Sequence, residues 1–287
     1  MNCPQVSESV AVTIVASLRQ LRHGPLKRFG PVWTALGTIY RLGLRAVGAS
    51  RPVEQKIGRN GPFLLHGEFT FSDFEHWGSG HNRGFELCIE ACRGKSCVLD
   101  VGAHIGLVTL PLSRAVAKDG QVFAFEPAEA NLRFLRVHLA LNGIGNVTIV
   151  DALVGPKKKP SVAFYEQPRA AGQNSVVVKK NPKAYRETRR RQITLDGFCL
   201  ENGLKPDVVK IDVEGGEIGV LQGAREILAR QRPLIFLSVH PVELGLLGSS
   251  SEDLAHLIDD LGYVCRDVDG NLVEGFRLDE YVLTPRH

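Results

Sequence analysis

The sequence predicts an α/β fold in which a mostly parallel sheet is covered by helices on both faces. Short apolar runs of strand length alternate with longer segments in which apolar residues recur at helical spacing. Strands that alternate with helices along a chain are typical of parallel sheets buried on both sides. At 287 residues, the chain is also long enough to bury a large core.

The alternation becomes regular from residue 84. Three helices and three strands are expected, in chain order, at helix 84–91, strand 97–101, a helix from about 107, strand 121–125, helix 128–141 and strand 147–150. Pro111 must lie in the first turn of its helix, because an interior proline removes a hydrogen bond. Asn142 and Gly143 are typical of a helix end and stop the third helix.

The second half of the chain continues the same order. Four strands and two helices are expected, at strand 207–213, helix 217–230, strand 233–239, helix 254–261 and strands 263–268 and 280–284. The serines before Leu254 can cap the last helix. The final two strands are expected to pair antiparallel through the turn Asp269-Gly270-Asn271. The sequence therefore predicts a mostly parallel seven-stranded sheet with a closing antiparallel hairpin.

The chain divides into a helical extension, an entry segment of short strands and turns, and a main α/β domain, at 1–50, 51–84 and 85–287. The extension is basic, because no acidic residue occurs between Glu8 and Glu54. Its apolar residues have helical spacing, so residues 10–50 would lie on an anionic membrane surface or pack on the main domain or a second subunit. Asn60-Gly61-Pro62 predicts the turn in the entry segment.

Composition favours a protein of the cytoplasm. The net charge is +4 and 44% of the residues are hydrophobic. No two of the six cysteines have CxxC spacing, so we expect free, largely buried thiols in a reducing compartment and no zinc site. The apolar run Val10–Leu18 is too short to span a bilayer, and no basic region precedes it as in a signal peptide.

Residues 155–192 interrupt the regular order and contain two basic clusters. The first is Lys157–Lys159, and the second extends from Lys179 to Arg191. One interpretation is a solvated loop or helix face. The other is a loop that covers the substrate and prefers anionic or polar acceptors.

The stretch from Val98 to Gly106 predicts a ligand site, because a strand there runs into a glycine-bearing turn before a helix. Gly102 and Gly106 allow a tight backbone path and a close ligand, and Ala103 lies between them. A dinucleotide motif would require glycine at positions 102, 104 and 107, but His104 and Leu107 stand at the last two.

Two carboxylates indicate which ligand this turn binds. Asp100 precedes the turn, where it would repel a pyrophosphate but can receive an ammonium group. Glu126 ends the next strand, where it can accept both hydroxyls of a ribose. Together they describe an amino acid joined to an adenosine, and Asp151, after the third strand, is assigned to the same ligand.

A second group of polar residues predicts the reactive end of the sheet. Lys210, Asp212 and Glu214 alternate, so their side chains lie on the same side of the chain. They form either a structural cluster or an acceptor site in which Asp212 or Glu214 is the base and Lys210 sets its charge. His240 ends the neighbouring strand and is a second candidate base. A metal site of oxygen and nitrogen ligands at Asp212, Glu214 and His240 is an open alternative, but no metal is assigned to these residues.

Several motifs resemble the FkbM-type methyltransferase family over about residues 85–245. They are DVGAHIG, FAFEP, LALNG, ALVG, ITLD, VKIDVEGGE and VLQGA. The resemblance implies a Rossmann-like class I methyltransferase domain at 85–287, S-adenosylmethionine as methyl donor, and a hydroxyl acceptor on a sugar, glycan or natural product. Two positions depart from the family. Ser238 replaces a frequent glutamate, and His104 replaces a usual asparagine.

Other functions remain open from the sequence. An NAD-dependent dehydrogenase is disfavoured by the glycine spacing. A non-catalytic binding module on the same fold and an N-methyltransferase are the alternatives to O-methyl transfer. The basic clusters permit a nucleic-acid substrate, but no base-handling motif or RNA-binding module is present, so no nucleic-acid partner is expected.

Overall fold

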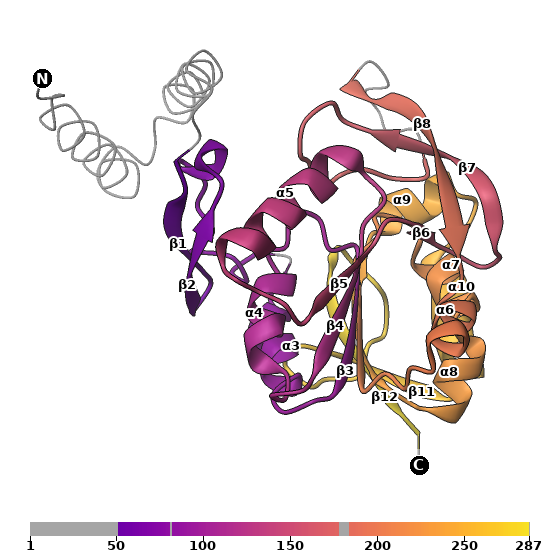
Figure 1. Cartoon of the computed structure of the whole chain (residues 1–287). Helices are drawn as coiled ribbons and strands as arrows, with labels where there is room; N and C mark the ends of the chain where they lie inside the picture. The colour runs from indigo at the N-terminus through magenta and orange to yellow at the C-terminus, as the bar shows by residue number, and fades with distance from the viewer. Residues whose placement is uncertain (1–50, 81, 178–183, 287) are drawn as a thin grey trace, which may run out of the picture. The chain divides into compact units, whose positions relative to one another are not determined.

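The computed structural model describes residues 51–80, 82–177 and 184–286 of the chain (Figure 1). The predictions for the extension at 1–50, including its helices and its membrane contact, lie outside the described residues. The chain divides into two compact units, of which one comprises 1–53 and 65–73 and the other 54–64 and 74–287. The elements from α3 onward, and the site they form, belong to the second unit.

A seven-stranded sheet forms the centre of the second unit, with strand order β11-β12-β10-β9-β3-β4-β5. The strands are β3 (Cys97–Val101), β4 (Gln121–Phe125), β5 (Val147–Val150), β9 (Val208–Ile211), β10 (Leu234–Val239), β11 (Tyr263–Asp267) and β12 (Asp279–Pro285). The neighbours from β10 to β5 pair in parallel, and β12 pairs antiparallel with both β10 and β11. The predicted fold class is therefore confirmed.

Helices cover both faces of this sheet (Figure 1). They are α3 (Phe85–Ala91), α4 (Thr109–Ala115), α5 (Glu129–Leu141), α6 (Leu195–Asn202), α7 (Glu217–Gln222), α8 (Arg225–Arg230), α9 (Pro241–Leu246) and α10 (Ser251–Asp260). Figure 1 shows α3, α4 and α5 on one side of the sheet and α6, α7, α8 and α10 on the other. Pro111 lies in the first turn of α4, and Ser250 caps α10, as predicted.

The single helix predicted at 217–230 is wrong, because α7 and α8 are separate. The carboxylate of Asp196 accepts the backbone N–H groups of Glu226 (3.0 Å) and Ile227 (2.9 Å) and so forms a cap for α8. The N–H of Asp196 donates to the carbonyl of Gly223 at 2.9 Å. The helical spacing of apolar residues continues from α7 into α8, so the sequence pattern does not show the break. The cap comes from Asp196, which is distant in the sequence and adds nothing to that local pattern.

The entry segment contains β1 (Val53–Ile57), β2 (Asn60–Leu65) and the short 3-10 helix η1 (Gly67–Phe69). Two strands and a turn were predicted here, but the turn is at Gly58 and Arg59, so Asn60-Gly61-Pro62 lies in β2. Gly58 has a φ of 56°, a conformation in which glycine is not strained.

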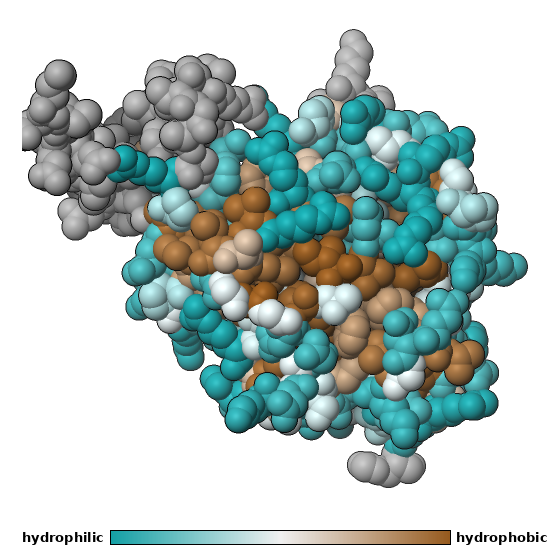
Figure 2. Space-filling model, in the orientation of Figure 1, coloured by the Kyte–Doolittle hydropathy of each residue, from teal (hydrophilic) through white to brown (hydrophobic). Residues whose placement is uncertain are grey.

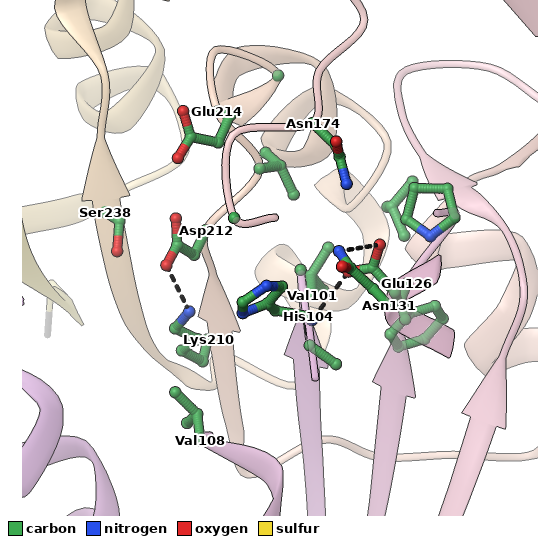
Figure 3. Close-up of a pocket in the computed structure, with 18 of the residues that line it drawn as sticks. Val101, His104, Val108, Glu126, Asn131, Asn174, Lys210, Asp212, Glu214 and Ser238 are labelled. Carbon is green, nitrogen blue, oxygen red and sulfur yellow. Dashed lines mark hydrogen bonds and ion pairs between the residues drawn. The ribbon is translucent and has the colours of Figure 1, made fainter. Parts of the chain in front are cut away.

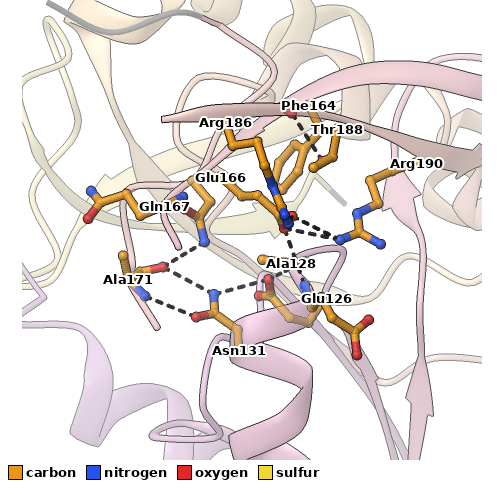
Figure 4. Close-up of polar contacts among 12 residues, drawn as sticks. Glu126, Ala128, Asn131, Phe164, Glu166, Gln167, Ala171, Arg186, Thr188 and Arg190 are labelled. Atoms are coloured by element: carbon orange, nitrogen blue, oxygen red, sulfur yellow. Dashed lines mark hydrogen bonds and ion pairs between the residues drawn. The ribbon is translucent and has the colours of Figure 1, made fainter. Parts of the chain in front are cut away.

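The interpretation of 155–192 as a loop or helix face is wrong for 159–166 and 186–192, because these residues are strands of a second sheet. The strands β6 (Leu153–Val154), β7 (Lys159–Glu166) and β8 (Arg186–Ile193) lie in the order β6-β8-β7. Glu166 is only 2% exposed and pairs with Arg186 at 2.9 Å and Arg190 at 3.1 Å (Figure 4). These two arginines therefore neutralise a buried carboxylate rather than face a ligand.

The described cysteines are free thiols, as expected. Cys88, Cys92, Cys97 and Cys199 are buried and Cys265 is half-buried.

Within the described ranges, no helix has both the length and the apolar character needed to cross a membrane.

Hydrophobic side chains form a band across the face shown in Figure 2, among hydrophilic ones. Large hydrophobic residues exposed on the described surface are Leu64, Leu87, Leu200, Val242, Leu246, Leu247, Leu272 and Leu278. Apolar atoms contribute more than half of an ordinary protein surface, so this exposure by itself indicates no function.

The ends of β3 and β9 meet at Gly102. Its φ is 91°, and a Cβ at this position would lie 1.8 Å from the carbonyl oxygen of Asp212. The N–H of Asp212 donates to the carbonyl of Val101 at 2.9 Å, and the N–H groups of Gly102 and Ala103 both donate to Phe125. The sequence interpretation linked this glycine to a close ligand, but the neighbour that requires it is the backbone of Asp212.

We predict that Gly102→Ala lowers the free energy of unfolding by more than about 3 kcal/mol, because backbone must move to accept the methyl group. Gly143→Ala is the matched control. Its φ is also positive, at 61°, but nothing lies within 4 Å of its Cβ position. We expect that control to cost only about 1–2 kcal/mol. Urea unfolding of both variants measures this, and equal losses would contradict the steric explanation.

Candidate functional site

A cavity of about 350 Å³ opens at the carboxyl ends of β3, β4, β9 and β10 (Figure 3). This is where open α/β sheets bind their ligands, and the volume is within the range of about 300–1,000 Å³ that is usual for small-molecule sites. The turn after β3 lines one part of the cavity, and the residues after β9 and β10 line another. The two predicted groups of site residues therefore meet at one cavity.

Glu126 lines the cavity from the end of β4. Its carboxylate accepts the N–H groups of His104 (2.8 Å) and Ala128 (2.9 Å) and the side-chain amide of Asn131 (3.1 Å). Burial raises the pKa of Glu126 to about 7, although these three donors act in the opposite direction. A carboxylate has about four acceptor positions, so Glu126 can still accept a ligand hydroxyl.

Gly102 and Ala103 line the cavity with Glu126, but the described structure places three other predicted cofactor residues outside the lining. Asp100 is fully buried below the turn and accepts a hydrogen bond from Thr109 at 2.6 Å. Its second oxygen is buried without a hydrogen-bond partner.

The other two predicted residues serve packing and backbone contacts in this structure. A Cβ on Gly106 would lie 2.9 Å from Leu135, so this glycine lets α5 approach the turn. Asp151 is half-buried, and its carbonyl accepts a hydrogen bond from Arg191 at 2.9 Å. The roles in cofactor binding assigned to these residues and to Asp100 stay predictions.

Two residues beside the cavity have strained backbone. His104 and Glu214 both have a φ of 53°, which is uncommon for residues other than glycine. His104 is half-buried with its Nε2 atom buried, and burial lowers its pKa to about 4, so it is neutral at pH 7. Strained residues of this kind are concentrated at functional sites.

The four predicted residues of the reactive end lie together (Figure 3 labels three of them). Lys210 contacts one oxygen of Asp212 at 3.0 Å. Nε2 of His240 lies 3.7 Å from the other oxygen of Asp212 and 3.6 Å from Glu214. Nδ1 of His240 lies 2.7 Å from Glu217, a fully buried residue that sequence reasoning had not selected.

The carboxylates determine the charge of the histidine and the lysine. Burial alone would lower the pKa of His240, but the hydrogen bond to Glu217 and the charges of Asp212 and Glu214 raise it to about 9. Burial opposes the charge of Lys210 as well, yet its acidic neighbours, of which Asp212 is the strongest, keep its pKa above the usual value. Neither group is a ready base at neutral pH.

A carboxylate also reaches Ser238, the position where the family often has glutamate. Glu280 faces Ser238 across β10 and β12 and accepts a hydrogen bond from its hydroxyl at 3.2 Å. Burial raises the pKa of Glu280 to about 7, although Lys210 acts against this. The two residues are 42 positions apart, so only the strand pairing reveals the contact.

The end of β7 and the segment that follows it also line the cavity, through Phe164 of β7 and through Gly172, Gln173, Asn174 and Val176. Asn131 fixes this segment through two hydrogen bonds with the backbone of Ala171, at 3.0 and 3.1 Å (Figure 4). Ser175 donates to the carbonyl of Glu214 at 2.7 Å. The interpretation of 155–192 as covering the substrate named its basic residues, whereas the residues that line the cavity here are uncharged, so that role stays a prediction.

We predict that Asn131→Ala increases hydrogen exchange in residues 167–176 by about tenfold or more, since the lost contacts are worth about 1–3 kcal/mol. Asn146→Ala is the control, because Asn146 also bonds backbone carbonyls, those of Ser113 and Gly120, away from this segment. Exchange measured by mass spectrometry should change in 167–176 only for Asn131→Ala. Unchanged exchange there would show that Asn131 does not hold the segment.

Part of this chain is similar in sequence to a known methyltransferase. Methyltransferase 1 of Beauveria bassiana (strain ARSEF 2860) is 27% identical over 146 residues, which are 45% of this chain and 58% of the relative. The chain thus spans less than two thirds of that relative.

Solved structures show only distant similarity. Methyltransferase FkbM from Methylobacillus flagellatus KT is 19% identical with a TM-score of 0.43, over 67% of this chain and 44% of that one. SMU.1697c from Streptococcus mutans, solved in complex with SAH, is 11% identical with a TM-score of 0.42, over 70% and 93%. The methyltransferase FkbM domain, in contrast, matches residues 100–265, more than half of the chain. The chain belongs to the FkbM methyltransferase domain family.

Proposed function

We propose that this protein transfers a methyl group from S-adenosylmethionine to a hydroxyl of a sugar, glycan or natural product. One observation carries the proposal. A single cavity is lined at one part by a glycine turn and Glu126, and at another by Asp212, Glu214 and His240. The first group suits a nucleoside with a charged amino acid, and the second suits an acceptor that must lose a proton.

The residues of the first part fit the methyl donor. Glu126 accepts three hydrogen bonds and keeps capacity for a ribose hydroxyl, and the apolar residues Phe125, Pro127, Ala152 and Leu153 line the cavity with it. These apolar side chains suit the faces of a purine ring. Below the turn, Asp100 contributes a buried carboxylate oxygen without a hydrogen-bond partner.

Asp212 is the residue best placed to handle the acceptor. Its side chain is 32% exposed, whereas Glu214 is 17% and His240 6% exposed, so it is the most open group of the cluster. Lys210 at 3.0 Å favours the ionised form of Asp212. The bound donor supplies a methyl group on a positively charged sulfur, which keeps the bonding electron pair when the methyl is transferred to the acceptor oxygen. Asp212 accepts the hydroxyl proton.

Positioning by the chain accounts for much of the rate. Holding two reactants in line can supply about 7–11 kcal/mol, and a placed base adds about 10²–10⁴-fold. An amine acceptor is less suited to this site, because the carboxylates would favour its protonated form, which cannot attack the methyl group.

We predict that the full-length protein binds S-adenosylhomocysteine and that its affinity falls as pH decreases below about 7. The carboxylate of Glu126 accepts hydroxyl hydrogens, and protonation near pH 7 removes that capacity. The decrease should approach tenfold per pH unit below pH 6, because a one-unit change corresponds to about 1.4 kcal/mol.

Isothermal titration calorimetry from pH 5.5 to 8.5 measures this dependence. Glu126→Gln should bind weakly with a flat pH profile. Glu280→Gln is the control, because burial raises the pKa of Glu280 to about 7 as well, but its carboxylate contacts Ser238 on another strand. It should keep the profile of the original protein. Absence of any binding heat at pH 8 would refute the proposed function.

We also predict that Asp212→Asn lowers kcat by about 10²–10⁴-fold with little change in affinity for S-adenosylhomocysteine, since it removes the proton acceptor and leaves the cofactor end intact. The acceptor is first found by incubating labelled S-adenosylmethionine with a panel of monosaccharides, sugar nucleotides and hydroxylated natural products. Turnover by the variant at the original rate would assign the base to another residue.

A further inference from the structure

We propose that Asp212, Glu214 and His240 together bind one divalent cation, and that this cation holds the acceptor hydroxyl. No metal was assigned to these residues from the sequence. The role of the cation rests on the proposed function, whereas the binding of the cation stands on geometry alone.

The ligand atoms are spaced as one metal ion requires. One oxygen from each carboxylate and one nitrogen of the histidine all lie within 4.8 Å of one another. Nε2 of His240 is 3.7 Å from Asp212 and 3.6 Å from Glu214. Two ligands at about 2.1 Å from a metal are about 3 Å apart at right angles and about 4.2 Å apart when opposite. Both measured spacings lie between these limits.

The histidine is oriented as a metal-binding histidine would be. His240 is 5% exposed, and its Nδ1 is held by Glu217 at 2.7 Å. Glu217 is in turn fixed by the N–H of Gly215 at 3.0 Å. Nε2 therefore points between Asp212 and Glu214, at distances longer than a hydrogen bond. A carboxylate behind the ligating histidine is the usual arrangement at metal sites, because it fixes the ring and its tautomer.

The local charge also favours a cation. Three carboxylates, from Asp212, Glu214 and Glu217, surround the imidazole within 3.7 Å. Lys210 contacts Asp212 at 3.0 Å and supplies one positive charge to this group. Either a proton on His240 or a metal ion between the side chains would balance the remaining charge. The position of Nε2 between two carboxylates suits both, and the Mn²⁺ titration below separates them.

The donor set indicates the kind of cation and its use. Two carboxylate oxygens and one imidazole nitrogen suit Mg²⁺ or Mn²⁺ better than a thiolate-preferring metal. A cation there polarises a bound hydroxyl and makes its proton easier to remove. Asp212 offers the cation the oxygen that faces His240. Its other oxygen contacts Lys210 at 3.0 Å and keeps a lone pair that can accept the hydroxyl proton.

The test uses the full-length protein after its metals have been removed with EDTA and the EDTA has been washed away. Mn²⁺ is then added stepwise, and the electron paramagnetic resonance signal of free Mn²⁺ reports binding. We expect one Mn²⁺ per chain. Asp212→Asn, Glu214→Gln and His240→Ala should each weaken binding by at least tenfold. Asp260→Asn, an exposed acid on α10, is the matched control and should bind Mn²⁺ like the original protein.

Two results distinguish a metal site from an acidic cluster. Glu217→Gln should weaken Mn²⁺ binding by about 10–100-fold without changing the affinity for S-adenosylhomocysteine, because Glu217 positions His240 and does not touch the cation. Loss of His240 should weaken binding. If His240→Ala leaves Mn²⁺ affinity unchanged or increases it, the histidine is only an ion-pair partner and the inference is wrong.

Calorimetry with S-adenosylhomocysteine on the same samples separates this inference from the proposed function. Variants that bind this probe normally are folded, so any loss of Mn²⁺ belongs to the site. If the original protein binds S-adenosylhomocysteine but does not bind Mn²⁺, only the cation site is overturned. If the original protein binds Mn²⁺ but does not bind S-adenosylhomocysteine, the proposed function is overturned and the cation site remains.

Discussion

The backbone contact between Gly102 and Asp212 is the constraint on which the cavity depends. The absence of a side chain at position 102 lets the carbonyl of Asp212 approach a point only 1.8 Å from where a Cβ would be. The two strands are also joined here by the hydrogen bond from Asp212 to Val101. The turn that contributes to the cofactor end and the carboxylate at the reactive end are therefore fixed to each other through main chain, which moves less than side chains.

The buried charges around this contact form one connected group. Lys210 interacts with Asp100 on one strand, Asp212 on its own strand and Glu280 on β12. A buried charge is costly unless it is paired, so each member depends on the others. Lys210 and Asp212 line the cavity, and Asp212 is the proton acceptor that we propose there. Residues that balance each other's buried charge are thus also residues that we propose to act on the acceptor.

The second sheet adds the opposite wall of the site. Its arginines do not form a binding surface as a whole, because two of them neutralise Glu166 (Figure 4). The segment that follows β7 instead reaches the cavity with uncharged residues such as Asn174 and Val176. Asn131 connects this wall to Glu126 by donating to both. We therefore expect the proposed acceptor to meet uncharged groups from this side and carboxylates from the other.

The sequence by itself determined the seven strands, their alternation with helices and the polar residues at the strand ends, since apolar spacing and residue type are local properties. Only the tertiary structure decided the cap from Asp196 that separates α7 and α8, the strands of 155–192, the support of His240 by Glu217 and the pairing of Glu280 with Ser238. These depend on contacts between residues far apart in the chain. The last follows from the position of β12 beside β10, which no local pattern encodes.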